Sequence, residues 1–161
     1  MSIARFGHVS EAQYLEAMAG MEDPMAVNDI PLPRRATAGS AGYDFTSPVT
    51  VTVPAGGSIL IPTGIRAEMN PDWVLLIFPR SSLGFKYGIR LSNTVGVIDS
   101  DYAHAKNEGH IMVKLSNGSE RDVTVLKGDR FCQGVFLPYG MAEEEGPVSE
   151  DRTGGFGSTG E

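Results

Sequence analysis

An all-β domain is the fold class that this sequence predicts, and three observations support it. The chain has 161 residues, which is the size of one ordinary domain. Glycine (20) and proline (10) together make up about a fifth of the residues, against roughly 12% in average usage, so the chain turns often. Short apolar segments with a period of two recur from Ile30 onward, and no long helical pattern separates them. A single domain with the architecture of a sandwich, jelly roll or barrel satisfies all three observations.

The first 30 residues are expected to form an extension with one short helix, from Glu11 to Ala19. Ser10 begins a capping box just before this segment. Tyr14, Leu15 and Met18 lie at helical spacing and would bury one face. Because terminal segments are usually peripheral, we expect the extension to lie apart from the chemistry.

Short strands are expected throughout the β core, residues 31–140. From Val49 to Val53 valine and threonine alternate strictly, as in a strand with one buried face. Asn117-Gly118 lies between two predicted strands and predicts a type I′ hairpin there. The predicted strands are Val49–Val53, Ser58–Ile61, Ile65–Met69, Trp73–Phe78, Gly88–Leu91, His110–Leu115, Asp122–Leu126 and Phe131–Leu137.

Charge and cysteine content argue against several classes of protein. The 13 basic and 20 acidic residues leave a net charge of −7, which disfavours a general binder of nucleic acids or anionic membranes. Cys132 is the only cysteine, so the chain can form no intrachain disulfide and no cysteine-rich zinc site. The longest apolar run, Trp73–Phe78, is far shorter than the ~20 residues of a membrane span. We therefore expect a cytoplasmic protein with no nucleic-acid partner and no membrane partner.

Residues 141–161 are expected to form a flexible arm. An acidic stretch is followed by a glycine-rich tail with one arginine, one aromatic residue and several hydroxyls, among which the candidates are Arg152, Phe156, Ser158 and Thr159. The guanidinium, the hydroxyls and the backbone N–H groups could together bind phosphate, and the aromatic ring could stack on a planar base. On its own the segment also fits a disordered polar terminus.

A second candidate phosphate site follows the apolar strand that ends at Phe78. Arg80, Ser81 and Ser82 come soon after it, and Gly84 would turn the chain. An arginine with two hydroxyls at a strand end can form a phosphate cradle, although a plain turn is the alternative. The segment does not match the Walker pattern, which requires a Gly-Lys-Ser/Thr step.

Three carboxylates are candidates for catalysis and metal binding. Asp99 and Asp101 follow an apolar stretch and would face the same side of a strand, where one could act as a general base toward water. Asp44 could help to hold a hydrated divalent cation, because oxygen ligands with retained waters suit magnesium bridged to a polyphosphate. Acids in a surface turn are the alternative. Jointly, these candidates describe a site for a nucleoside triphosphate.

Five segments in this order resemble the five motifs of the trimeric dUTP diphosphatases (dUTPases). They are Ala41–Asp44, Pro79–Leu83, Gly96–Tyr102, Gly128–Gln133 and Gly154–Gly160. The resemblance spans about Leu32 to Gly160. It implies a jelly-roll protomer in a homotrimer, with active sites at the subunit interfaces that hydrolyse dUTP to dUMP and pyrophosphate with Mg²⁺.

The resemblance also implies roles for individual residues. Asp99 corresponds to the base that activates the attacking water, and Asp44 to the acid that binds waters of the magnesium shell. The phosphate contacts would be Arg80, Ser81, Ser82 and Gln133. In the tail, Arg152, Ser158 and Thr159 would meet the β- and γ-phosphates, Phe156 would cover the base, and Gly157 would lie between them in a closing lid.

The uracil and sugar contacts follow from the same resemblance. Asn93 and the backbone of Gly96, Val97 and Ile98 would read the uracil edge, with Met112 as a main-chain contact opposite. Tyr102 would pack under the sugar and exclude a 2′-hydroxyl. The segment after Tyr102 departs from the family pattern, because Ala103–Ile111 replaces a shorter step. We interpret it as an inserted loop.

Two alternatives to dUTP hydrolysis stay open at this point. One is a dCTP deaminase on the same fold, either alone or combined with dUTPase activity. The other is a dUTPase scaffold that binds a regulatory protein. For the second, the contact surfaces would be the loop Ala103–Glu108 and the N-terminal helix.

Overall fold

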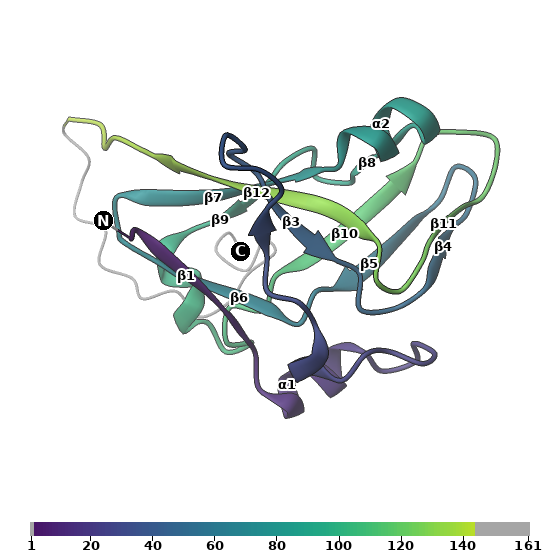
Figure 1. The fold of residues 1–161 in the computed structure, drawn as a ribbon, viewed down its shortest axis with the longest axis horizontal. Helices are drawn as coiled ribbons and strands as arrows, with labels where there is room; N and C mark the ends of the chain where they lie inside the picture. Colours follow the sequence, from purple (N-terminus) through teal and green to yellow (C-terminus); the bar gives the residue numbers. More distant parts are fainter. Residues whose placement is uncertain (1, 144–161) are drawn as a thin grey trace.

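Four antiparallel sheets form the framework of residues 2–143, which the computed structural model describes (Figure 1). The largest sheet has the order β2 (Arg34–Arg35), β3 (Tyr43–Thr46), β12 (Arg130–Pro138), β7 (Trp73–Pro79) and β9 (Gly96–Ile98). The three-stranded sheet has the order β5 (Ser58–Pro62), β10 (Met112–Asn117) and β8 (Ile89–Leu91). The two-stranded sheets pair β1 (Ala4–His8) with β6 (Ile65–Met69), and β4 (Val51–Val53) with β11 (Val123–Val125). The prediction of an all-β domain is confirmed.

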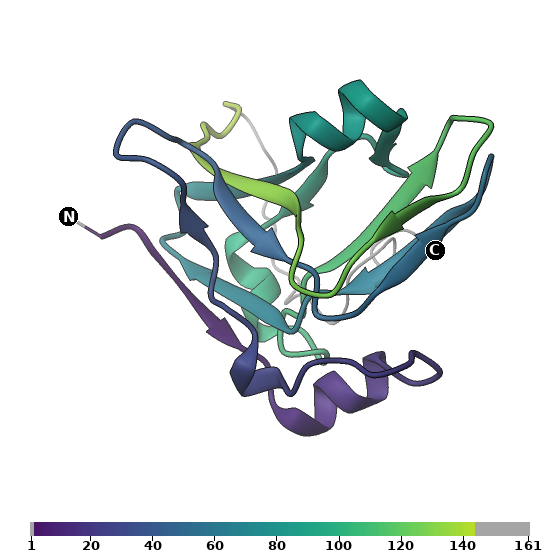
Figure 2. The ribbon, with the colours of Figure 1, turned by 45° about the vertical axis from the view of Figure 1, so that its right-hand side comes forward.

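The helices are short and lie outside the sheets. Figure 2 has α1 (Glu11–Ala17) at the bottom and α2 (Ser81–Tyr87) at the top, on opposite sides of the framework. Two 3₁₀ helices are also present: η1 (Val27–Asp29) lies between α1 and β2, and η2 (Ser100–His104) lies between β9 and β10. Within residues 2–143, no helix is long and apolar enough to cross a membrane.

The alternation of apolar and polar residues in the sequence predicts the strands, because every second side chain of a strand points into the core. In β4, Val51 and Val53 are buried and Thr52 is exposed, and the Thr52 hydroxyl lies 3.1 Å from that of Thr124 on β11. All the predicted strands are present, with ends that differ from the prediction by at most two residues. The sequence pattern missed β1, β2, β3 and β9, which are short or lack regular alternation.

The predicted hairpin at Asn117-Gly118 is wrong. The strand before it, β10, pairs with β5 and β8, whereas the strand after it, β11, pairs with β4. Asn117 is buried, and its Nδ2 donates to the carbonyls of Val53 (3.0 Å) and Arg121 (2.7 Å). The side-chain amide therefore anchors a corner where the chain passes from one sheet to another.

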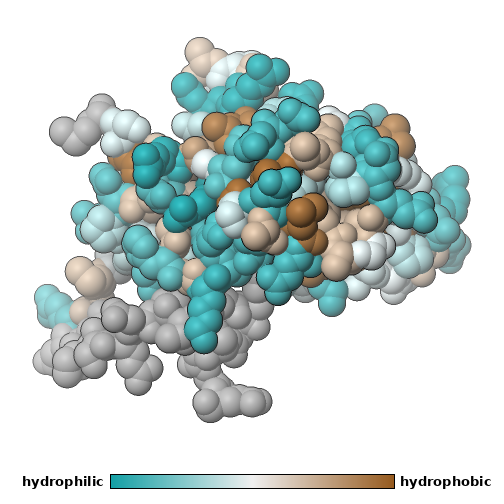
Figure 3. Space-filling model, turned by 90° about the horizontal axis from the view of Figure 1, so that it is seen from below, coloured by the Kyte–Doolittle hydropathy of each residue, from teal (hydrophilic) through white to brown (hydrophobic). Residues whose placement is uncertain are grey.

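The N-terminal extension is part of the core. Helix α1 begins as predicted, with the Ser10 hydroxyl accepting from the Gln13 N–H at 3.2 Å, and ends two residues earlier than expected. Tyr14 and Met18 are buried, but Leu15 is 57% exposed, so the predicted apolar face is only partly correct. The surface on the α1 side is mostly hydrophilic, with small separated hydrophobic areas (Figure 3).

Candidate active site

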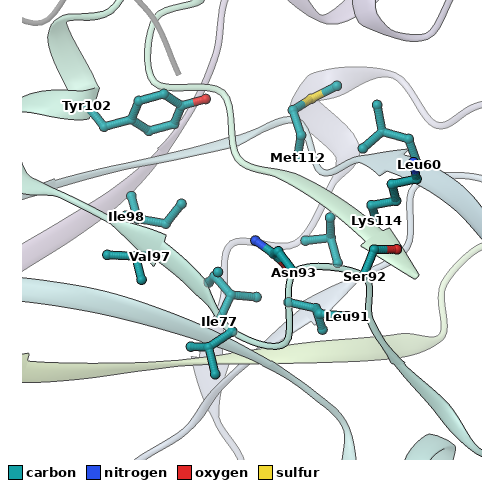
Figure 4. Close-up of a pocket in the computed structure, with 13 residues that line it drawn as sticks. Leu60, Ile77, Leu91, Ser92, Asn93, Val97, Ile98, Tyr102, Met112 and Lys114 are labelled. Atoms are coloured by element: carbon teal, nitrogen blue, oxygen red, sulfur yellow. The ribbon is translucent and has the colours of Figure 1, made fainter. Parts of the chain in front are cut away.

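An apolar pocket of about 360 Å³ lies where β7, β8, β9 and β10 come together (Figure 4). Its lining is Leu60, Ile77, Leu91, Ser92, Asn93, Val95, Gly96, Val97, Ile98, Tyr102, Met112, Val113 and Lys114. All the residues expected to read the uracil edge or to pack under the sugar are in this lining. In Figure 4 the Asn93 amide points into the space that these side chains enclose.

A tight turn between β8 and β9 builds one wall of the apolar pocket. Thr94 has a positive φ of 70°, and its N–H donates to the Leu91 carbonyl at 3.1 Å. Strand β9 then pairs with β7, with Gly96 opposite Ile77. A Cβ at Gly96 would lie only 3.1 Å from the Ile77 Cβ, so glycine allows the two strands to approach closely.

A second, polar pocket of about 360 Å³ lies where β7 ends and Arg80 follows it. Its lining is Ala36, Ser40, Gly42, Asp44, Arg80, Ser81, Ser82 and Gln133. Strand β12 runs between β3 and β7, and its Gln133 is opposite both Asp44 and Phe78. The pairing of these strands therefore gathers the predicted phosphate and metal residues at one place.

Asp44 lies between two guanidinium groups in the polar pocket. Its side chain is only 10% exposed, with Oδ1 3.5 Å from Arg80 Nε. The Arg130 Nη1 donates to Oδ2 at 3.0 Å. Two arginines around one carboxylate leave a net positive charge, which suits a polyanionic ligand. No sequence pattern predicts a role for Arg130, because its contact with Asp44 depends on the pairing of β3 with β12.

The predicted turn after Pro79 is the beginning of helix α2. Arg80 has extended backbone at the N-cap, so Ser81 and Ser82 form the first turn, and Gly84 lies inside the helix. No residue of α2 is buried, and Phe85 is 94% exposed. Serine and glycine are weak helix formers, and a helix without a buried face has no apolar period, so the sequence carried little signal for it.

Asp99 lies beside the apolar pocket and away from the polar one. It is the N-cap of η2, and Asp101 lies inside that helix, so the predicted strand at these acids is wrong. The preceding residue, Ile98, is opposite Leu75. Arg80 comes five residues after Leu75 in the chain. At about 3.3 Å per residue, the backbone of Arg80 is roughly 16 Å from the strand position opposite Ile98. Asp99 is not among the residues that line the polar pocket.

The metal prediction rests on Asp44 alone among the described residues. Residues 2–143 contain no group of three or more His, Cys, Asp or Glu side chains that could ligate a metal directly. Mg²⁺ usually keeps several waters and binds one or two carboxylates together with substrate phosphates. Asp44, as one carboxylate in a pocket that also holds the predicted phosphate contacts, fits that mode of binding. The predicted tail residues Arg152, Phe156, Gly157, Ser158 and Thr159 lie outside the described residues.

Comparison with known proteins gives the family. The sequence model of the dUTPase family matches residues 28–160. The chain belongs to the dUTPase family. The deoxyuridine 5′-triphosphate nucleotidohydrolase of Lactococcus lactis is 46% identical over 133 residues, covering 81% of this chain and 89% of that protein. The enzyme of the same name from Glaesserella parasuis is 44% identical over 139 residues, covering 82% and 89%.

A solved structure agrees with this assignment of the dUTPase fold. The crystal structure of the dUTPase from Streptococcus mutans superposes with a TM-score of 0.68 at 36% identity, covering 86% of this chain and 98% of that one. The predicted jelly-roll-like fold of dUTPases is therefore confirmed. The roles of the individual site residues remain predictions.

Proposed function

We propose that this chain hydrolyses dUTP to dUMP and pyrophosphate, which keeps uracil out of DNA and supplies dUMP for thymidylate synthesis. The observation that carries the proposal is the apolar pocket, whose lining contains all the residues expected to read the uracil edge or to pack under the deoxyribose. Membership of the dUTPase family supports the same reaction.

Base selection would depend on the turn and strand that follow Leu91. The Asn93 amide and the backbone of β9 supply hydrogen-bonding groups at one edge of the apolar pocket. Cytosine presents a donor where uracil presents an acceptor, and leaving one buried group unpaired costs about 1–3 kcal/mol. A tight hairpin also leaves no room for the methyl group of thymine. Tyr102, on the same pocket, would pack under the sugar and exclude a ribose 2′-hydroxyl.

The triphosphate would bind in the polar pocket. Arg80 would pair with phosphate oxygens, and Ser81, Ser82 and Gln133 would donate hydrogen bonds. Asp44 would hold waters of a bound Mg²⁺ ion. When bound, magnesium neutralises part of the phosphate charge and polarises the phosphoryl oxygens. The tail residues Arg152, Phe156, Gly157, Ser158 and Thr159 would close over the nucleotide and exclude water.

Asp99 would act as the general base that orients and deprotonates the water attacking the α-phosphorus. The backbone of Arg80 is roughly 16 Å from the strand position opposite Ile98. This separation favours a site to which two protomers contribute. We therefore infer a homotrimer with active sites at the subunit interfaces. The protein would work in the cytoplasm without a nucleic-acid or membrane partner.

Pyrophosphate release from dUTP, dTTP, dCTP and UTP, with and without Mg²⁺, tests this function. We expect release from dUTP in the presence of Mg²⁺ and little from the other three nucleotides. Ammonia release from dCTP without pyrophosphate release from dUTP would contradict the proposal and favour a deaminase. The mass of the protein in solution tests the trimer, and a monomer that turns over dUTP would contradict it.

A further inference from the structure

The loop after η2 folds back onto the helix that carries Tyr102. The Glu108 N–H donates to the Ala105 carbonyl at 2.8 Å, and the Ala105 N–H donates to the Tyr102 carbonyl at 3.0 Å. Gly109 has a φ of +72°, and a Cβ there would lie 2.7 Å from the Ala103 Cα and 2.8 Å from the Tyr102 carbonyl oxygen. Only glycine allows this approach, so the close contact between loop and helix is built into the sequence.

Asn107, in this loop, binds the hydroxyl of Tyr102. Its Nδ2 donates to the Tyr102 Oη at 2.7 Å, and its Oδ1 accepts from the Gly109 N–H at 3.2 Å, so both ends of the amide are used. The Tyr102 hydroxyl in turn donates to the His110 carbonyl at 2.9 Å. Tyr102 is 3% exposed and lines the apolar pocket. Two hydrogen bonds therefore fix the outer end of a ring that forms part of the pocket wall.

The loop is itself anchored to the N-terminal extension. The Glu108 carboxylate accepts from the Ser10 N–H at 2.7 Å and from the Ser10 hydroxyl at 2.6 Å. The Ser10 hydrogen bonds hold the pKa of Glu108 below its ordinary value. Two residues after Glu108, the side chain of His110 is also held, because its Nε2 accepts from the Gly64 N–H at 2.8 Å. Asn107 is thus held between anchored neighbours and cannot move away from Tyr102 without breaking them.

We propose that Asn107 is a positioning residue that sets the selectivity for deoxyribose over ribose by fixing the Tyr102 ring against the sugar. This inference rests on the proposed dUTP hydrolysis. A ring whose hydroxyl is held on two sides cannot shift to admit a 2′-hydroxyl. The single proton of that hydroxyl is donated to the His110 carbonyl, so it is not offered to a ribose.

The experiment compares Asn107→Ala with Lys106→Ala, a matched control on the exposed neighbouring residue. The measured quantity is the ratio of kcat/KM for dUTP to kcat/KM for UTP. We expect about a tenfold lower ratio in Asn107→Ala, because one hydrogen bond to the ring is lost and UTP is admitted more readily. The ratio should not change in Lys106→Ala. A ratio in Asn107→Ala within twofold of the unaltered protein overturns the inference.

Tyr102→Phe distinguishes positioning from a general loss of structure. It removes only the hydroxyl and keeps the Asn107 bond to Gly109, so it remains informative if Asn107→Ala fails to fold. We expect the ratio to fall at least as far as in Asn107→Ala, because Tyr102→Phe removes the hydrogen bonds to both Asn107 and His110. The double variant should fall no further than Tyr102→Phe, since that change already removes the Asn107 hydrogen bond. Additive losses in the double variant would overturn the inference.

Binding of the products separates the inference from the proposed function. Calorimetric binding of dUMP and UMP reports sugar selectivity without turnover. If the unaltered protein releases no pyrophosphate from dUTP, the proposed function fails, while a preference for dUMP that Asn107→Ala reduces about tenfold still supports the role of Asn107. If dUTP is hydrolysed but neither selectivity changes in Asn107→Ala, the inference alone fails.

Discussion

The apolar pocket and the polar pocket have similar volumes, about 360 Å³ each, but different construction. The apolar pocket has walls from strands packed on the core, and residues such as Leu91 and Tyr102 are buried. The polar pocket lies at the ends of β3, β7 and β12, where Arg80 keeps 31% of its side chain exposed and Arg130 keeps 50%. One pocket is shaped by packing within one chain, and the other by charges at a strand end.

This difference indicates how the two halves of a nucleotide would be bound. An apolar pocket with a fixed wall can select a base and a sugar by shape and by a few hydrogen bonds. Ion pairs between exposed side chains are weak by themselves, so the polar pocket gains strength only when a polyanion, a metal ion and a covering segment displace water. The following predictions test this division, from the largest expected effect to the smallest.

Asp99→Asn should have the largest effect, because it removes the proposed base while leaving both pockets intact. We expect kcat for dUTP to fall on the order of 1,000-fold, within the usual range for loss of a general base. The trimer and dUTP binding should be retained, as measured by solution mass and calorimetry. Near-normal pyrophosphate release would exclude Asp99 as the base.

Deletion of residues 152–161 should weaken mainly the binding of the triphosphate, and it also removes Phe156, which would cover the base. Loss of the tail's arginine and hydroxyls removes charge-assisted hydrogen bonds, and we expect kcat/KM for dUTP to fall roughly 100-fold. The melting temperature should not change, since Phe156 is the one large apolar residue in this glycine-rich segment of the sequence. A variant that lacks only Glu161 is the control, and an unaffected rate in the longer deletion would remove the lid from the mechanism.

Arg80→Ala and Gly96→Val should separate the two pockets. Arg80→Ala should lower kcat/KM for dUTP about 30-fold through one lost phosphate contact, and leave the binding of deoxyuridine within about twofold. In Gly96→Val the new side chain would collide with Ile77, so deoxyuridine binding should weaken at least about tenfold. Deoxyuridine titrations followed by NMR measure both. Equal losses of deoxyuridine binding in the two variants would contradict the division.

His110 should affect the free energy of unfolding and have the smallest effect on turnover. Its carbonyl accepts a hydrogen bond from the pocket residue Tyr102. Burial lowers its pKa from 6.5 to about 4. Above pH 6.5 the imidazole is neutral in both the folded and the unfolded chain, so its full contribution to stability is present. Between pH 6.5 and 4 only the unfolded chain takes up the proton, and the free energy of unfolding should fall by about 3 kcal/mol.

Urea unfolding at pH 7, 5.5 and 4 measures this loss. His110→Gln should flatten the pH dependence over this range, because it removes the buried imidazole. A pH profile that is the same in His110→Gln as in the unaltered protein would assign the loss to other groups.

Local patterns predicted the elements that depend on nearest neighbours in the chain. The start of α1 at Ser10 follows from a side chain that caps its own helix, and β4 follows from strict alternation. The hairpin at Asn117 was wrong because its buried amide binds the carbonyls of Val53 and Arg121 in place of forming a turn. Helix α2 was missed because it buries no residue, so hydrophobic periodicity carries no information about it.

The sequence by itself determined the fold class, the family and the residue types of the site, because these depend on composition, period and motif order. Only the tertiary structure decided which of these residues meet. The register of β12 against β3 and β7 brings Asp44, Arg80 and Gln133 into one pocket, and the turn at Gly109 brings Asn107 to Tyr102. Strand register and the direction of a hydrogen bond depend on the packing of the whole chain, which no local pattern encodes.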